Sequence, residues 1–128
     1  MKITFFSFGY KFSGIPVDNT GNEGGFVFDC RFLPNPYKEE DLKNYDGRNK
    51  KIKDYFSRFE IVDKFCDNVV SIIDMAAGNY DIRGFENLFV AFGCTGGMHR
   101  SVYCMERVEN YFSVKGYKTV KFHVELEK

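Results

Sequence analysis

The sequence lacks any apolar run of the roughly 18 to 20 residues that a membrane-spanning helix requires. Met1-Lys2 is not followed by the apolar block of a signal peptide either. We therefore expect no membrane association and a location in the cytoplasm. A phosphate-binding string of the form Gly-x-x-x-x-Gly-Lys-Ser/Thr is also missing, so the residues give no basis for ATP or GTP binding.

Net charge is absent too, because 18 basic residues balance 18 acidic ones. A neutral chain has no overall attraction for nucleic acid, so RNA binding would need a local basic patch. The four cysteines form no Cys-x-x-Cys pair and have no histidine at zinc-ligand spacing: Cys30, Cys66, Cys94 and Cys104. This pattern argues against a disulfide framework and a zinc site, and we expect no resident cofactor.

The composition is that of an ordinary folded domain. Of the 128 residues, 44% are hydrophobic and 18% are aromatic, which is ample material for one core. Apolar or alternating segments predict strands at residues 2–8, 26–32, 88–92 and 119–124. The segment 9–25 between the first two is too rich in glycine for a helix or strand interior, and it is expected to be a surface loop.

Helical spacing of apolar residues fills the rest of the chain. It predicts helices over residues 50–56, from 60 to Gly78, and from near His99 to near Lys115, with Gly78 and Gly116 as the caps of the second and third. Because strands alternate with helices, we predict an α/β layered fold with a largely parallel sheet flanked by helices. No linker or repeat divides residues 1–128, so a single domain is expected.

The strongest functional signal is the string GCTGGMHRS at residues 93–101, between the third predicted strand and its helix. Ligands of parallel α/β sheets bind beyond the carboxyl ends of the strands. Gly96 and Gly97 allow successive amides to converge on one anion, and the helix start adds positive potential. Arg100 can bind phosphate oxygens through two N–H groups, and Thr95 and His99 can add hydrogen bonds. The loop is therefore predicted to bind a phosphoryl group.

Two other interpretations of this loop stay open. It could be a turn that only packs the helix against the strand. Alternatively, Cys94 and Arg100 are separated by five residues and followed by Ser101, which resembles the signature loop of cysteine-dependent phosphatases. Cys94 would then be the nucleophile and Arg100 the clamp. However, Gly93 stands where those enzymes usually have histidine, and no spacing selects a general acid.

Polar residues near the second strand are further candidates. Asp29 and Arg31 either complete the pocket or form an ion pair with each other. Asn35 and Tyr37 follow on a proline-rich turn, where they either close over a ligand or hold the turn.

The last strand and its surroundings carry a small basic cluster, Lys115, Lys118 and Lys121, that either contacts RNA phosphates or forms a solvated surface. Glu125 and Glu127 dilute its charge. His123 is predicted to face solvent and is assigned no role.

Three strings in this order resemble one known family: SFGYKFSGIP at 7–16, VFDCRFLPNPY at 27–37 and GCTGGMHRSV at 93–102. They are similar to the C-terminal domain of the RNase adapter protein RapZ, and with the terminal LEK they span nearly the whole chain. The resemblance implies an α/β regulatory domain, reminiscent of phosphofructokinase subunits, that senses glucosamine-6-phosphate. In the full-length bacterial protein it also implies binding of small regulatory RNA, or contact with a regulatory protein, and assembly into a homo-oligomer.

The resemblance assigns ligand contacts to Thr95, Gly96, His99 and Arg100, with Cys94 beside them. An amino-sugar phosphate also needs polar partners for its hydroxyl and amino groups, for which we select Asp29, Asn35 and Ser7.

This chain departs from the family pattern in three ways. It lacks the Walker-type loop of the family's nucleotide-binding domain, and its last six residues, His123 to Lys128, replace a basic tail with two glutamates. The loop after Gly14 is longer and polar. The sequence thus predicts a sensor of a small phosphorylated sugar, with an RNA-binding adapter and a cysteine phosphatase as alternatives.

Overall fold

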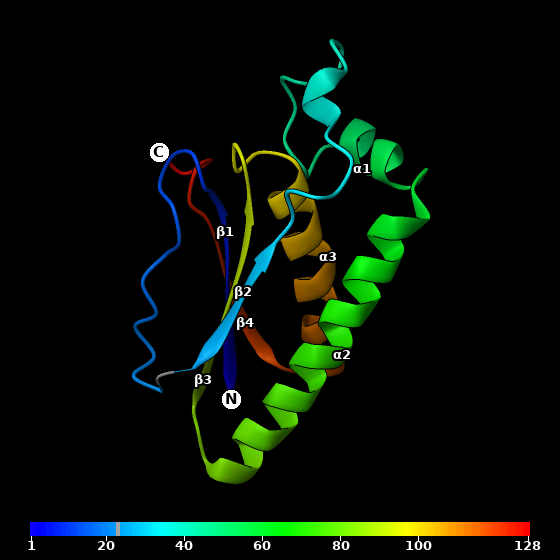
Figure 1. Ribbon diagram of the computed structural model, residues 1–128. Helices are drawn as coiled ribbons and strands as arrows, with labels where there is room; N and C mark the ends of the chain where they lie inside the picture. The colour runs from blue at the N-terminus through cyan, green and yellow to red at the C-terminus, as the bar shows by residue number, and fades with distance from the viewer. Residues whose placement is uncertain (23) are drawn as a thin grey trace.

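Four parallel strands form one sheet in the computed structural model, which describes residues 1–22 and 24–128 (Figure 1). The strand order is β2-β3-β1-β4, and each neighbouring pair is parallel. The strands are β1 (Lys2–Gly9), β2 (Gly25–Asp29), β3 (Asn87–Cys94) and β4 (Lys118–His123). The predicted parallel α/β fold is confirmed.

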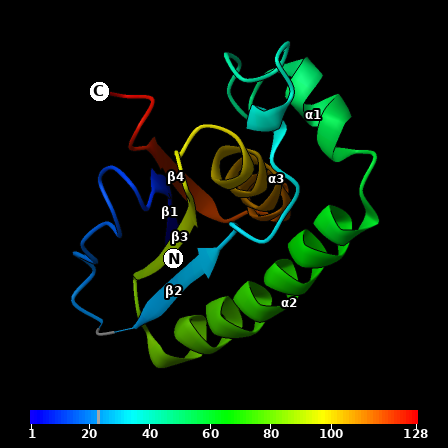
Figure 2. The same ribbon diagram turned by 45° about the horizontal axis from the view of Figure 1, so that its top comes forward.

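The described residues also form one short 3-10 helix and three α-helices, namely η1 (Pro36–Lys38), α1 (Lys50–Phe56), α2 (Glu60–Arg83) and α3 (Arg100–Lys115). Helices α2 and α3 cover one face of the sheet, and the segment 10–22 runs along the other (Figure 2). The connections from β2 to β3 and from β3 to β4 cross the sheet in one direction, whereas that from β1 to β2 crosses in the opposite one. Because crossovers between parallel strands are right-handed, opposite directions place the connections on opposite faces.

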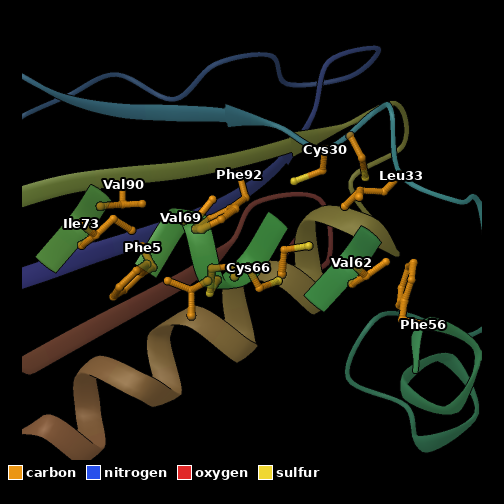
Figure 3. Close-up of a cluster of buried hydrophobic side chains, with 14 of the residues drawn as sticks. Phe5, Cys30, Leu33, Phe56, Val62, Cys66, Val69, Ile73, Val90 and Phe92 are labelled. Atoms are coloured by element: carbon orange, nitrogen blue, oxygen red, sulfur yellow. The ribbon is translucent and has the colours of Figure 1, made fainter. Parts of the chain in front are cut away.

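The main core lies between the sheet and the two long helices (Figure 3). Phe5 of β1 and Val90 and Phe92 of β3 meet Val69 and Ile73 of α2, and all five side chains are buried. The central strands β1 and β3 are thereby held rigidly, which places their carboxyl ends side by side in register, Gly9 opposite Cys94. No helix in the described part of the chain is both long and apolar enough to cross a membrane.

Two predicted boundaries are wrong. Strand β2 ends at Asp29 and not at residue 32, because the Asp29 carboxylate accepts a hydrogen bond from the backbone N–H of Arg31 (2.9 Å) and turns the chain. Helix α2 continues past Gly78 to Arg83, since Tyr80 in the added turn still packs against the core. Its left-handed cap is Gly84 (φ 76°). By contrast, α1 covers the predicted residues, and Gly116 caps α3 as expected.

The prediction that His123 faces solvent is also wrong. Its side chain is buried on the helix-covered face, where Nδ1 lies 2.6 Å from Ser7 Oγ and Nε2 lies 2.6 Å from Glu106 Oε2. Lys121, two residues earlier on the same face, forms an ion pair with Glu106 (3.2 Å). Phe122 instead points to the opposite face and stacks on Phe6. The side chains of β4 do alternate between the two faces of the sheet as predicted. The polar ones lie on the helix-covered face because Glu106 and Glu109 of α3 provide ion-pair partners there.

Glu106 should make the stability of the fold dependent on pH. The hydrogen bond with His123, opposed by burial and aided by Lys121, lowers the pKa of Glu106 to about 2 from an ordinary 4.5. A carboxylate with a depressed pKa stabilises the fold above its unfolded pKa and loses that contribution as the pH falls through its folded pKa. We expect Glu106→Gln to unfold more easily at pH 7, by at most about 3 kcal/mol, with the difference vanishing near pH 2.

Urea unfolding followed between pH 7 and pH 2 measures this difference. Glu60→Gln is the matched control, because Glu60 is exposed and pairs only with Lys64 within α2. A Glu106→Gln penalty that stays constant across the whole range would contradict the assignment.

Candidate functional site

The loop of residues 95–99 joins β3 to α3 at the carboxyl edge of the sheet, next to the end of β1. The segment leaving β1 is tied to this loop by two backbone hydrogen bonds: Tyr10 N–H donates to the Cys94 carbonyl (2.9 Å) and Lys11 N–H to the Thr95 carbonyl (3.1 Å). The two central strands thus bring residues that are 84 positions apart in the sequence to one place.

Glycines allow the two segments to touch through their backbones. A Cβ on Gly97, whose φ is +73°, would lie 2.7 Å from the Gly9 nitrogen, and a Cβ on Gly9 would lie 2.8 Å from the carbonyl carbon of Gly96. Side chains at positions 9 and 97 are therefore excluded. Gly96, in contrast, has open space where its Cβ would be, so it leaves the backbone accessible from the pocket side.

Helix α3 begins without a capping side chain. His99 occupies the N-cap position and makes no side-chain cap, and the first turn carries no acidic residue. Within the described residues, the backbone N–H groups of residues 95–99 donate to no backbone carbonyl. Unpaired amides at the start of a 16-residue helix carry partial positive charge and favour an anion.

Arg100 places a full positive charge at the same point. Its side chain is buried, and Nη1 donates to the backbone carbonyls of Arg31 (2.6 Å) and Leu33 (3.3 Å). Nη2 reaches Thr95 Oγ1 at 3.5 Å, and Nε has no partner in the described structure. Because all these partners are neutral oxygen atoms, they leave the charge of the guanidinium uncompensated.

His99 contributes a second buried nitrogen atom without a partner. Burial lowers the pKa of His99, while hydrogen bonds with the backbone of Tyr45 and Lys43 act in the opposite direction. The imidazole is therefore neutral at pH 7. Its Nε2 has no hydrogen-bond partner among the described residues. A buried polar atom left unpaired costs stability, so both His99 and Arg100 are poised for a polar ligand.

A cavity of about 290 Å³ opens beside these groups. Its size is near the lower end of small-molecule pockets, which span roughly 300 to 1,000 Å³. Ten residues line it: Lys11, Phe12, Asn35, Tyr37, Cys94, Thr95, Gly96, Met98, His99 and Arg100. They come from the segment after β1, the turn after β2, and the loop before α3, so three connections at one edge of the sheet build the pocket.

Among the residues selected from the sequence, most of the loop residues and Asn35 line this cavity. Asn35 also caps η1, where its side chain accepts the N–H of Tyr37 (3.1 Å), so both proposed roles of that turn are compatible. Gly97 and Ser101 lie behind the lining: Gly97 packs on Gly9, and Ser101 is buried with Oγ 3.1 Å from Cys94 Sγ.

Besides Gly97 and Ser101, three more of the selected residues do not line the cavity. Ser7 is fully buried and bonded to His123. Asp29 and Arg31 form a half-exposed ion pair (2.7 Å), and hydrogen bonds from Arg31, opposed by burial, lower the pKa of Asp29. The Arg31 guanidinium also lies 3.8 Å from the centre of the Tyr10 ring. The ion-pair interpretation of Asp29 and Arg31 therefore describes their contacts.

Sequence reasoning missed three lining residues, Lys11, Phe12 and Met98, whereas Tyr37 was already a candidate. Lys11 had a usable signal: it follows the carboxyl end of a strand, and parallel strands bring such ends together. Phe12 and Met98 carried none, because an apolar residue in a loop is not distinctive.

The geometry gives little support to a phosphatase. The position of a Gly93 side chain is filled, since a Cβ there would lie 2.5 Å from the Phe8 ring and 2.6 Å from the Tyr10 ring. The histidine that usually precedes the nucleophile cannot be accommodated. Cys94 is a buried thiol packed against Ser101.

The basic cluster, for which RNA contact was one of two interpretations, is largely neutralised. Lys115 pairs with Asp74 (2.7 Å), and Lys121 pairs with Glu106 and, at 3.7 Å, with Glu109. Only Lys118 is left of the three for a phosphate without breaking an ion pair shown in the described structure. This surface therefore offers weak electrostatic attraction for nucleic acid.

Comparisons with known proteins agree with the resemblance. Residues 1–127 match the family model described as the RapZ C-terminal domain. Three relatives, each named "nucleotide-binding protein", come from Clostridium botulinum (41% identical over 116 residues), Caldicellulosiruptor saccharolyticus (38% over 128) and Thermotoga neapolitana (34% over 128).

These matches cover 91% to 100% of this chain. The same matches cover only 37% to 43% of each relative, so this chain spans about two fifths of their length. The agreement of a whole-chain family match with the three strings at the sheet edge settles the family. The chain belongs to the RapZ C-terminal domain family.

Proposed function

We propose that this domain binds a small phosphorylated ligand, with the phosphoryl group at residues 95–100 and the rest of the ligand in the adjoining cavity. One observation carries the proposal: an uncapped helix start with free amides coincides with two buried polar side chains, His99 and Arg100, that each have a nitrogen atom without a partner. The free amides and the Arg100 N–H favour an oxyanion, whereas the unpaired Nε2 of the neutral His99 ring can accept a hydrogen bond from a ligand hydroxyl or amino group.

The lining indicates what the rest of the ligand is. Lys11 adds a second positive charge, and Asn35 and Tyr37 offer polar groups for hydroxyls opposite the loop. A cavity of about 290 Å³ suits a single sugar ring better than a nucleoside phosphate with a base and a ribose. We therefore propose a phosphorylated sugar, in particular an amino-sugar phosphate such as glucosamine-6-phosphate, and a regulatory role in which occupancy alters contact with a partner.

The name of the relatives, nucleotide-binding protein, refers to chains more than twice as long as this one. This chain has no Gly-x-x-x-x-Gly-Lys-Ser/Thr string. We therefore rank a nucleotide below a sugar phosphate and include it in the test.

Titration calorimetry with glucosamine-6-phosphate, glucose-6-phosphate, ATP, inorganic phosphate and unphosphorylated glucosamine tests the proposal. We expect binding of the sugar phosphates, weaker binding of phosphate, and none of glucosamine, because the anion site supplies most of the affinity. The Lys118→Ala variant is the control and should bind these compounds as the wild type does, since it removes a positive charge at the amino end of β4, far from the cavity. Failure of every phosphorylated compound to bind would remove the proposed function.

A further inference from the structure

A carboxylate from the C-terminal segment holds the turn that leaves β1. Glu125, two residues after β4, accepts the backbone N–H of Gly9 (2.9 Å) and that of Ser13 (3.2 Å) through Oε2. Its Oε1 accepts the Ser13 hydroxyl (2.9 Å), and Lys128 forms an ion pair with it (2.9 Å). The side chain of Glu125 is almost completely buried. Residues at the two ends of the sequence are thus joined by one charged group.

The turn that Glu125 holds is one wall of the binding cavity. Within it, Phe12 N–H and Gly14 N–H both donate to the Gly9 carbonyl (3.0 Å each), so residues 9–14 form a compact loop. Lys11 and Phe12 at its tip line the cavity. Glu125 accepts hydrogen bonds from Gly9 and Ser13 of this loop, and the carbonyls of Cys94 and Thr95 accept those of Tyr10 and Lys11.

Glu125 also contacts the loop of residues 95–99 that joins β3 to α3. A Cβ on Gly97 would collide with Cγ of Glu125 as well as with the Gly9 nitrogen, so these three residues meet at one point. Burial alone would raise the pKa of Glu125, but hydrogen bonds from Gly9, Lys128 and Ser13 outweigh it and hold the pKa below its ordinary value. The carboxylate is consequently ionised at neutral pH, and its negative charge strengthens the hydrogen bonds that it accepts from Gly9 and Ser13.

We propose that Glu125 is a positioning residue for the binding site: by anchoring Gly9 and Ser13 it holds the charged side chain of Lys11 where it contacts the ligand. This inference rests on the proposed function. It reverses the expectation from the sequence, in which Glu125 only diluted a basic surface. Because Glu125 acts through Lys11, its effect on affinity should depend on Lys11 being present.

A double-mutant cycle with glucosamine-6-phosphate as the probe tests this. Glu125→Ala should weaken binding by about tenfold, because it removes three hydrogen bonds to an ionised group. Glu125→Gln, which keeps a single uncharged acceptor oxygen and places an NH2 donor at the other position, should give an intermediate loss. Lys128→Ala, the matched control, removes the exposed ion-pair partner and should change affinity by no more than about twofold. In a Lys11→Ala background, Glu125→Ala should add no more than about twofold.

Two results would overturn the inference while leaving the proposed function intact. One is wild-type affinity in Glu125→Ala; the other is the full loss of affinity in the Lys11→Ala background, which would mean that Glu125 loosens the whole fold. If the wild-type protein binds none of the phosphorylated compounds, hydrogen exchange without ligand still decides the anchoring. Faster exchange at residues 10–12 in Glu125→Ala but not in Lys128→Ala supports it, and unchanged exchange refutes it.

Discussion

Replacing Arg100 with alanine is expected to weaken binding of glucosamine-6-phosphate by about 100-fold, which corresponds to about 3 kcal/mol. The substitution removes the only guanidinium that lines the cavity in the described structure, and with it the full charge beside the helix start. It also leaves the carbonyl groups of Arg31 and Leu33 without their donor. We therefore expect a second effect, a loss of about 1 to 3 kcal/mol in the free energy of unfolding.

Titration calorimetry and urea unfolding separate these two effects. Arg31→Ala is the matched control, because Arg31 lies at the same edge of the sheet but turns its guanidinium to Asp29 and Tyr10. We expect that variant to bind nearly as the wild type does. Arg100→Lys keeps the charge without the forked donors, and it should recover part of the affinity. Equal losses in Arg31→Ala and Arg100→Ala would show that only general charge matters.

Gly97→Ala is expected to be the most damaging single change in the loop. An alanine at φ +73° costs about 1 to 2 kcal/mol by itself. Its Cβ would also press into the Gly9 backbone and Glu125, neither of which can move without disturbing β1 or the C-terminal segment. We expect a loss of about 2 to 4 kcal/mol in the free energy of unfolding, together with loss of ligand binding.

The neighbouring glycine provides an unusually close control. A Cβ at Gly96 would meet no atom within 4 Å, and Gly96 has no positive φ, so Gly96→Ala should change stability by less than about 0.5 kcal/mol. Chemical denaturation of both variants measures the difference. Similar stabilities for the two would mean that the loop has no rigid packing against β1.

The backbone elements were predictable where a local rule applied. Strand β3 follows from an apolar run, and the end of α3 follows from Gly116, whose left-handed conformation is a local property. The end of α2 was mispredicted because Gly78 looked like a cap, whereas Tyr80, beyond Gly78, still packs against the core and favours further helix. A glycine ends a helix only where packing no longer rewards its continuation.

Part of the candidate site was also predictable, because it is encoded by a local stretch of sequence. Residues 93–101 are contiguous, so their chemistry can be read from the string itself. His123 was misplaced because its burial depends on Glu106, 17 positions earlier, and on Ser7, 116 positions earlier. No local pattern distinguishes a solvated histidine from one that meets polar partners across a helix and a strand.

By itself, the sequence determined the parallel α/β fold, the family, and the strand-to-helix loop with its anion-binding residue types, because periodicity and contiguous motifs are local. Only the tertiary structure decided which separate segments complete the cavity. It brought Lys11 and Asn35 to the loop, turned Asp29 and Arg31 toward each other, and placed Glu125 behind Gly97. The physical reason is the strand order β2-β3-β1-β4, which sets distant strand ends side by side.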